Sequence, residues 1–191
     1  MATLHDAFVD EVRDLFDAEK QLVKALPKLA KNASSDELRS ALEEHLEETR
    51  NHVSRLEQVF EALGQKPRGK HCAGIAGIIE EGGEVLEQEG DDDVLDAMII
   101  ASAQRTEHYE MAAYGTVVAW AEALDMPESA RLLQQTLDEE KAADQKLSKL
   151  AEQGINQAAR AGESDEEEEA ETGKSGRGNG RAAGAQAKGR R

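Results

Sequence analysis

The sequence of 191 residues has few aromatic side chains and few prolines. Aromatic residues make up 3% of the chain, whereas alanine, leucine, glutamate, lysine and glutamine recur throughout it. Strands favour aromatic and β-branched residues, and the residues that dominate here favour helices. The three prolines, at positions 27, 67 and 127, leave long windows in which a helix can continue. The composition therefore predicts an all-α protein.

The chain also lacks the features of a disulfide-bonded, secreted or membrane protein. Its one cysteine, Cys72, excludes an intrachain disulfide, so nothing requires an oxidising compartment. No window reaches the roughly 18–20 apolar residues that a membrane-spanning helix needs. The first six residues have neither the basic start nor the apolar stretch of a secretory signal. We therefore expect a soluble, intracellular protein with no membrane partner.

Positive charge is scarce, with 23 basic against 40 acidic residues and a net charge of −17. Such a surface repels phosphate, which argues against nucleic-acid binding by the body of the protein, and it attracts cations. Seven acids lie within 163–171 and six basic residues within 174–191, with almost no large apolar side chains. We expect 161–191 to be a disordered tail that contacts nucleic acid only weakly, if at all. Residues 1–160, the expected folded domain, keep 33 acids and 17 bases.

Four long segments carry apolar residues at steps of three and four, which is the pattern of amphipathic helices. They span about 4–31, 35–64, 92–124 and 126–155. The first and last pairs are joined by a few residues and therefore predict antiparallel hairpins. The connection over 64–91 is long enough to run the length of a 30-residue helix, about 45 Å, and its middle predicts one or two short helices. Two hairpins joined by one long crossover are typical of a ferritin-like four-helix bundle.

Each apolar stripe is interrupted near its middle by acidic residues or histidines. The interrupting residues are Glu19 in the first segment, His45, Glu48 and His52 in the second, Glu107 in the third, and Glu140 and Asp144 in the fourth. A single inward glutamate is commonly a misplaced surface residue, but several unpaired carboxylates inside one bundle would each cost several kcal/mol. No matching lysines or arginines lie on these stripes. Two cations would balance the charge, and oxygen ligands with an imidazole suit iron or manganese.

Four motifs carry a specific resemblance to a known family. They are LFDAEKQL at 15–22, HLEETRNHV at 45–53, EHYEMAAYG at 107–115 and EEKAAD at 139–144. In this order they closely resemble the YciE/YciF stress-protein family (DUF892), a branch of the ferritin-like superfamily that is similar in layout to rubrerythrins. The resemblance covers nearly all of 3–155. It implies a cytoplasmic, stress-induced homodimer with a centre of two metal ions.

The resemblance also implies roles for individual residues. The implied metal ligands are Glu19, Glu48, His52, Glu107, Glu110, Glu140 and Asp144, with Glu48 and Glu140 bridging or flanking the ions. The superfamily pairs glutamate with histidine at a spacing of three, whereas Glu48 with His52 and Glu140 with Asp144 are four apart, which still places each pair on one helical face. Asp144 in place of a second histidine makes the site more anionic. His45 is expected beside Glu48 as a hydrogen-bond partner, or else as a further ligand. Tyr114 is either a core tyrosine or a hydrogen-bond donor to a ligand.

Three functions remain open at this point. The first is a peroxidase-like di-iron or di-manganese oxidoreductase that acts on peroxide, oxygen or superoxide. The second is an iron-binding or iron-sequestering protein without turnover. The third is a non-catalytic stress or interaction module in which the metal is structural.

Overall fold

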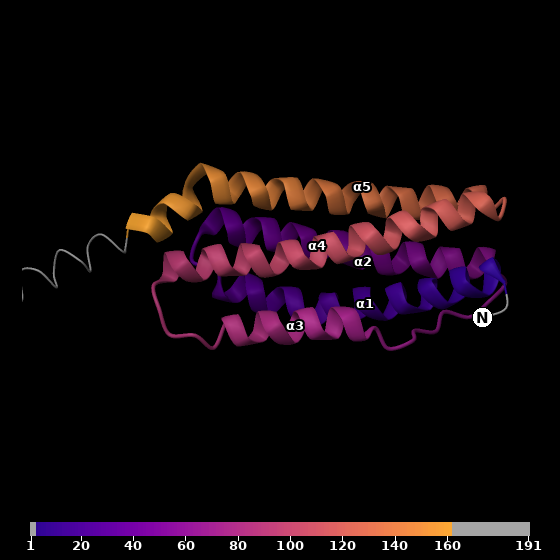
Figure 1. The fold of residues 1–191 in the computed structure, drawn as a ribbon, viewed down its shortest axis with the longest axis horizontal. Helices are drawn as coiled ribbons and strands as arrows, with labels where there is room; N and C mark the ends of the chain where they lie inside the picture. Colours follow the sequence, from indigo (N-terminus) through magenta and orange to yellow (C-terminus); the bar gives the residue numbers. More distant parts are fainter. Residues whose placement is uncertain (1–2, 162–191) are drawn as a thin grey trace, which may run out of the picture.

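The computed structural model describes residues 3–161, which form helices and no strand (Figure 1). The helices are α1 (Leu4–Asn32), α2 (Asp36–Ala62), α3 (Ala73–Val85), α4 (Asp92–Ala123) and α5 (Pro127–Leu150), and a π-helical turn (Ala151–Ile155) follows α5. The predicted helix boundaries agree with the structure to within two residues except at the end of α5, where the π turn begins at Ala151. The acidic and basic runs of the predicted tail lie outside the described residues.

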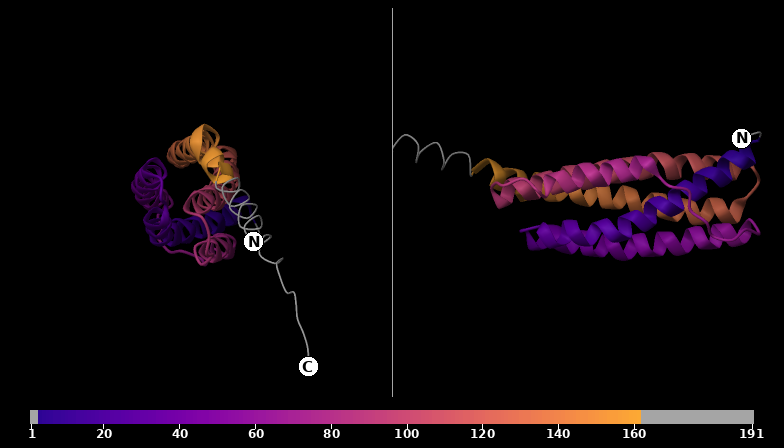
Figure 2. Two further views of the ribbon diagram at one scale, coloured as in Figure 1. Left: turned by 90° about the vertical axis from the view of Figure 1, so that its left-hand side faces the viewer. Right: turned by 90° about the horizontal axis from the view of Figure 1, so that it is seen from below.

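The four long helices form an antiparallel bundle in which α1 packs on α2 and α4, and α5 packs on α2 and α4 (Figures 1 and 2). The α1–α2 and α4–α5 connections are short, and the long connection between α2 and α4 contains α3, which lies along α1 and α4. The predicted all-α, ferritin-like arrangement of two hairpins and a crossover is confirmed, with one helix in the crossover.

A buried aspartate ties the α1–α2 turn to α4. Asp96 of α4 is 1% exposed and accepts hydrogen bonds from the backbone N–H groups of Ser34 and Ser35 at 2.8 and 2.7 Å, and from the Ser34 hydroxyl at 2.7 Å. Ser35 caps α2 by accepting from the N–H of Leu38. Because the aspartate satisfies N–H groups at the start of α2, it fixes the first hairpin against α4 and sets the relative height of the helices.

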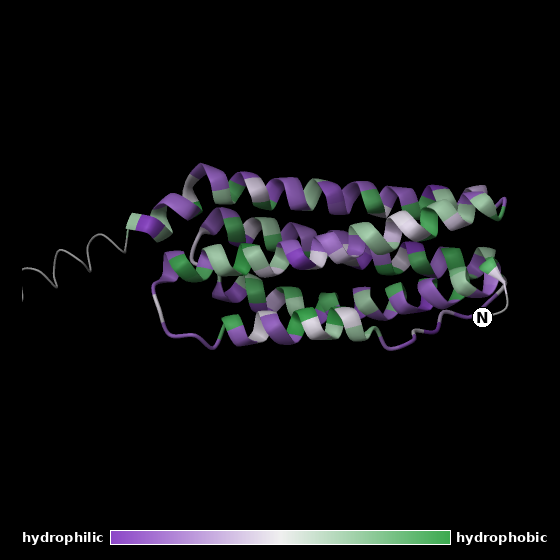
Figure 3. Ribbon diagram, in the orientation of Figure 1, coloured by the Kyte–Doolittle hydropathy of each residue, from purple (hydrophilic) through white to green (hydrophobic). Residues whose placement is uncertain are grey.

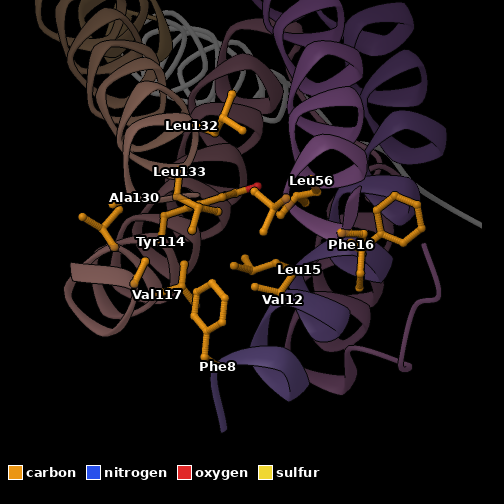
Figure 4. Packing of buried hydrophobic residues seen from close by; sticks show 14 of the residues in the cluster. Phe8, Val12, Leu15, Phe16, Leu56, Tyr114, Val117, Ala130, Leu132 and Leu133 are labelled. Carbon is orange, nitrogen blue, oxygen red and sulfur yellow. The ribbon is translucent and has the colours of Figure 1, made fainter. Parts of the chain in front are cut away.

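The apolar core is divided into two main clusters, one toward each end of the bundle. The first joins the N-terminal half of α1 and the C-terminal half of α4 to facing parts of α2 and α5, and includes Phe8, Leu56, Tyr114 and Leu133 (Figure 4). The second joins the opposite ends and includes Leu26, Leu38, Ile99 and Leu147. Hydrophilic residues occupy the middle of the bundle between them (Figure 3). The core thus leaves a polar layer at mid-height.

Candidate metal centre

The polar layer consists of six ionisable side chains from all four long helices. They are Glu19 on α1, His45 and His52 on α2, Glu107 and Glu110 on α4, and Glu140 on α5. The histidine nearest the surface is 6% exposed, and the other five residues are at most 1% exposed. Each lies within the apolar stripe of its helix, so the same packing that buries the stripe also buries the ionisable side chain.

The six residues form two overlapping groups in which one potential ligand atom per residue lies within 4.8 Å of the others. The first group is His45, Glu107, Glu110 and Glu140, and the second is Glu19, His52 and Glu140. Glu140 belongs to both groups. Its position therefore suits a carboxylate that is shared between two cations.

The two oxygens of Glu140 face different histidines. Oε1 lies 3.0 Å from Nδ1 of His52, and Oε2 lies 3.7 Å from Nε2 of His45. Nδ1 of His52 also lies 3.5 Å from Oε1 of Glu19, and Nε2 of His45 lies 3.3 Å from Oε1 of Glu107. Each histidine therefore turns one ring nitrogen toward carboxylate oxygens of the layer.

Many of these buried atoms have no hydrogen-bond partner. His52 Nδ1 and Glu140 Oε1 have only each other, at 3.0 Å, and the unpartnered atoms of the layer are Oε2 of Glu19, Oε2 of Glu107, both oxygens of Glu110 and Oε2 of Glu140. An unsatisfied buried polar group costs about 1–3 kcal/mol, and more when it is charged. Four ionised carboxylates carry the charge that two divalent cations neutralise, and oxygen with imidazole donors suits iron, manganese or zinc. The residues present therefore fit a pair of metal ions.

Burial and crowding shift the proton affinities of the layer. Burial raises the pKa of Glu107 and of Glu110 well above the ordinary value, and the neighbouring charge of Glu140 raises both further. Burial would lower the pKa of His52, but the charges and hydrogen bonds of Glu19 and Glu140 outweigh it and raise that pKa to about 11. Without metal, the layer therefore holds protons on His52 and on carboxyl groups of α4, and bound cations must displace them.

A carboxylate outside the layer fixes the tautomer of His52. Nε2 of His52 lies 2.9 Å from Oε2 of Glu139, and Arg55 donates to both oxygens of that carboxylate at 2.6 and 2.7 Å. Burial would raise the pKa of Glu139, but the hydrogen bonds from Arg55 and His52 lower it, so the group is ionised and only accepts. Nε2 must then carry the proton, which leaves the Nδ1 lone pair free to face the layer when the ring is neutral.

His45 has a similar outer partner. Its Nδ1 lies 3.2 Å from Oε2 of Glu48, whose side chain is 45% exposed. When Glu48 is ionised, Nδ1 donates to it and Nε2 presents its lone pair toward Glu107 and Glu140. Tyr114 orients a carboxylate of the layer in a similar way, because its buried hydroxyl donates a hydrogen bond to Oε1 of Glu19.

The structure brings together five of the residues for which sequence implied a ligand role: Glu19, His52, Glu107, Glu110 and Glu140. It also places His45 in the first group, so this histidine lies close enough to be a ligand as well as the partner of Glu48. It leaves Glu48 and Asp144 outside both groups.

Asp144 is 19% exposed, accepts from Gln104 at 3.0 Å and lies 3.3 Å from Nε2 of His108. Sequence reasoning missed Arg55 and Glu139. One signal was present, since Arg55 follows His52 by three residues on the same helical face.

The fold and the polar layer define an all-α bundle with a buried carboxylate and imidazole site, and comparison with known proteins then gives the family. Residues 3–160 match the family described as a domain of unknown function, DUF892. The chain is 44% identical to protein YciF of Escherichia coli K12 over 160 residues, which cover 83% of this chain and 96% of YciF. The chain belongs to the DUF892 family, as the motifs predicted.

Solved structures support the same assignment. The crystal structure of the E. coli stress protein YciF matches with a TM-score of 0.79 over 82% of this chain and 99% of that one. YcfI from Rhodopseudomonas palustris is 47% identical and matches with a TM-score of 0.75, over 76% of this chain and 93% of that one. A Xanthomonas campestris protein, 18% identical with a TM-score of 0.69, shares the fold over 85% of this chain and 99% of its own. Among the described residues, no helix is long and apolar enough to cross a membrane.

Proposed function

We propose that the protein binds two metal ions, iron or manganese, in the polar layer and uses them to handle peroxide, oxygen or iron under stress. The observation that carries this proposal is the convergence of unpartnered carboxylate oxygens and one imidazole nitrogen from all four long helices in a closed interior. Without metal, only the proton of His52, protons on the carboxyl groups of α4 and the Tyr114 hydroxyl offset the burial of these acids. The E. coli relative is described as a stress protein, which is consistent with this role.

The donors divide between two positions that share Glu140. His45, Glu107 and Glu110 would hold one ion, and Glu19 and His52 the other. A bound pair of redox-active ions supplies electrons for the cleavage of an O–O bond. The protein holds both imidazoles in the required tautomers through Glu139, Arg55 and Glu48, so little reorganisation accompanies ligand binding.

Protons move between defined groups when the centre fills. His52 would release its Nδ1 proton, and Glu107 and Glu110 theirs, to solvent, because each position cannot hold a proton and a cation together. Tyr114 keeps its hydroxyl hydrogen bond to one oxygen of Glu19 and leaves the other oxygen unpartnered. The layer is screened from water by the two apolar clusters above and below it.

Metal content per chain tests the proposal directly. Metal-free protein is reconstituted anaerobically with ferrous iron or manganese, desalted, and analysed by elemental analysis; we expect two ions per chain. Glu140→Gln removes the shared carboxylate and is expected to lower occupancy at both positions, whereas Glu19→Gln is expected to lower it at one. Glu128→Gln, an exposed residue of α5, is the matched control. Wild-type protein that keeps less than half an ion per chain would refute the centre.

Turnover is a separate measurement. We expect the loaded wild-type protein to consume hydrogen peroxide faster than the Glu140→Gln variant carried through the same loading. Equal rates together with two bound ions would leave iron binding without turnover, or a structural metal, as the function.

A further inference from the structure

Two pockets reach the polar layer from different sides of the bundle, and Glu107 lines both of them. The first, of about 90 Å³, opens between α2 and α5. The second, of about 80 Å³, opens between α1, α3 and α4. The shared residue is 1% exposed, and its Oε2 has no hydrogen-bond partner, so an unsatisfied carboxylate oxygen stands at the inner end of the pockets.

The pocket between α2 and α5 is lined by ionisable side chains that become progressively more buried toward the layer. The side chains of Glu44 and Lys146, which pair with each other, are 63% and 47% exposed. The side chain of Glu48 is 45% exposed, that of its partner His45 is 8% exposed, and that of Glu107 is 2% exposed. A cation that moves inward therefore meets carboxylate or imidazole atoms at each depth.

Small residues keep this pocket open. Ala41 of α2 and Ala142 and Ala143 of α5 line it, where larger side chains would let the two helices fill the gap. The ion pair of Glu44 with Lys146 spans the same two helices at its outer end.

The pocket between α1, α3 and α4 offers a cation far fewer charged or polar ligand atoms. Its lining is mainly aliphatic and includes Leu22, Leu26, Ile78, Ile79 and Leu86, with the hydroxyl-bearing residues Ser102 and Thr106 near Glu107. A divalent ion would lose water there without gaining charged oxygen ligands until the last step, which is costly.

We propose that metal cations enter the centre through the pocket between α2 and α5, with Glu48 as a transient ligand that passes them to His45 and Glu107. This inference rests on the proposed function, because it concerns the filling of the same site. Glu48 fits the role because its carboxylate contacts solvent and a histidine of the layer at once. The positive charge of Lys146 at the opening opposes entry, and its pairing with Glu44 reduces that effect.

The test follows uptake of Co²⁺ by the full-length, metal-free protein, with absorbance in a stopped-flow instrument and final content by elemental analysis. Ala143→Leu fills the charged pocket, and Ala25→Leu makes the same change in the apolar pocket. We expect Ala143→Leu to slow uptake by about tenfold and Ala25→Leu to change it less than twofold, with the same final content in both.

Charge is tested separately from space. Glu48→Gln is expected to slow uptake by at least about threefold, whereas Glu61→Gln, which removes the same charge from the far end of α2, should not. Lys146→Gln is expected to speed uptake, and Lys66→Gln, in the loop after α2, should not.

The outcomes separate the route from the centre. If the wild-type protein binds cobalt and Ala143→Leu loads as fast as Ala25→Leu, the route is wrong and the centre stands. If Glu48→Gln lowers the final content without changing the rate, Glu48 acts on the filled centre, as a resident ligand or as the partner that orients His45, and its transient role is wrong. If the wild-type protein binds no cobalt, the proposed centre itself fails.

Discussion

Replacing Glu110 with glutamine is expected to stabilise the metal-free protein, and most or all of that gain is expected to be lost when metal is bound. Glu110 is fully buried, and neither of its carboxyl oxygens has a hydrogen-bond partner. Burial and the charges of Glu140 and Glu19 raise its pKa well above the ordinary value, so the folded protein without metal favours the protonated carboxyl group there. The variant needs no such proton, and its amide N–H groups can donate to neighbouring carboxylates.

The magnitude follows from the cost of unsatisfied buried groups, about 1–3 kcal/mol for each. We therefore expect Glu110→Gln to raise the free energy of unfolding of the metal-free protein by about 1–3 kcal/mol. For a chain of this size that corresponds to a melting temperature higher by roughly 3–9 °C. With saturating metal, a 100-fold loss in affinity removes about 2.7 kcal/mol of stabilisation, which offsets most or all of that gain.

The assay is urea unfolding followed by far-ultraviolet circular dichroism, with chelator and with saturating manganese. Glu122→Gln, an exposed residue of α4, is the matched control and should change neither value by more than about 0.5 kcal/mol. A metal-free Glu110→Gln protein that is less stable than wild type would show that the carboxyl group makes a favourable contact, and the reasoning would fail. Equal stabilisation with and without manganese would remove Glu110 from the ligand set.

Three further predictions concern the support of the layer, the crossover and pH. Arg55→Met removes the hydrogen bonds that hold Glu139, which orients the imidazole of His52, and is expected to weaken metal affinity about 10–100-fold in a chelator competition. Arg50→Met changes an exposed arginine of the same helix and should leave the affinity unchanged. Gly74→Ala puts a Cβ 2.5 Å from a tyrosine ring carbon of α4 and is expected to lower the free energy of unfolding by about 1–3 kcal/mol; Gly77→Ala, with no atom within 4 Å, should be neutral or stabilising. The free energy of unfolding of the metal-free protein is expected to fall as pH rises above about 4.5, because the buried carboxyl groups of α4 bind protons more tightly in the folded state than in the unfolded state. Urea unfolding measured at several pH values tests this, and Glu110→Gln should make the dependence on pH less steep.

Much of the fold was predictable because local patterns and connection lengths agree. The spacing of apolar residues gave four helices, and the contrast between two short connections and one long one gave the ferritin-like order. The register also followed, since the polar interruptions at Glu19, Glu107 and Glu140 lie near the helix midpoints and meet at one height. The position of α3 was less determined, because a short helix in a crossover can pack against more than one pair of neighbours.

Helical phase explains why the predicted site differs in detail from the observed one. Residues of a helix turn by about 100° per step, so Glu48 lies about 60° from His45 and about 40° from His52 around α2. A difference of this size moves a side chain from the interior to the edge, and sequence spacing alone does not determine how the helix is rotated. Similarly, Glu139 and Glu140 are adjacent, and only packing of α5 on α2 turns Glu140 inward and Glu139 toward Arg55.

The residues gathered in the polar layer change how the departure from the ferritin-like pattern should be understood. That pattern places one histidine on each of two helices, three residues after a glutamate. Sequence comparison therefore made Asp144 the replacement of a missing histidine. In the structure, both imidazoles come from α2, because His45 and His52 are seven residues apart and share one face.

The layer thus contains four glutamates and two histidines, the same numbers as in the superfamily pattern. Both histidines lie on α2, which contributes no glutamate, and α4 contributes two glutamates, Glu107 and Glu110. Asp144 is then free to pair with Gln104 and His108 outside the layer, so Asp144→Asn is expected to leave metal content unchanged, which elemental analysis beside Glu140→Gln would check.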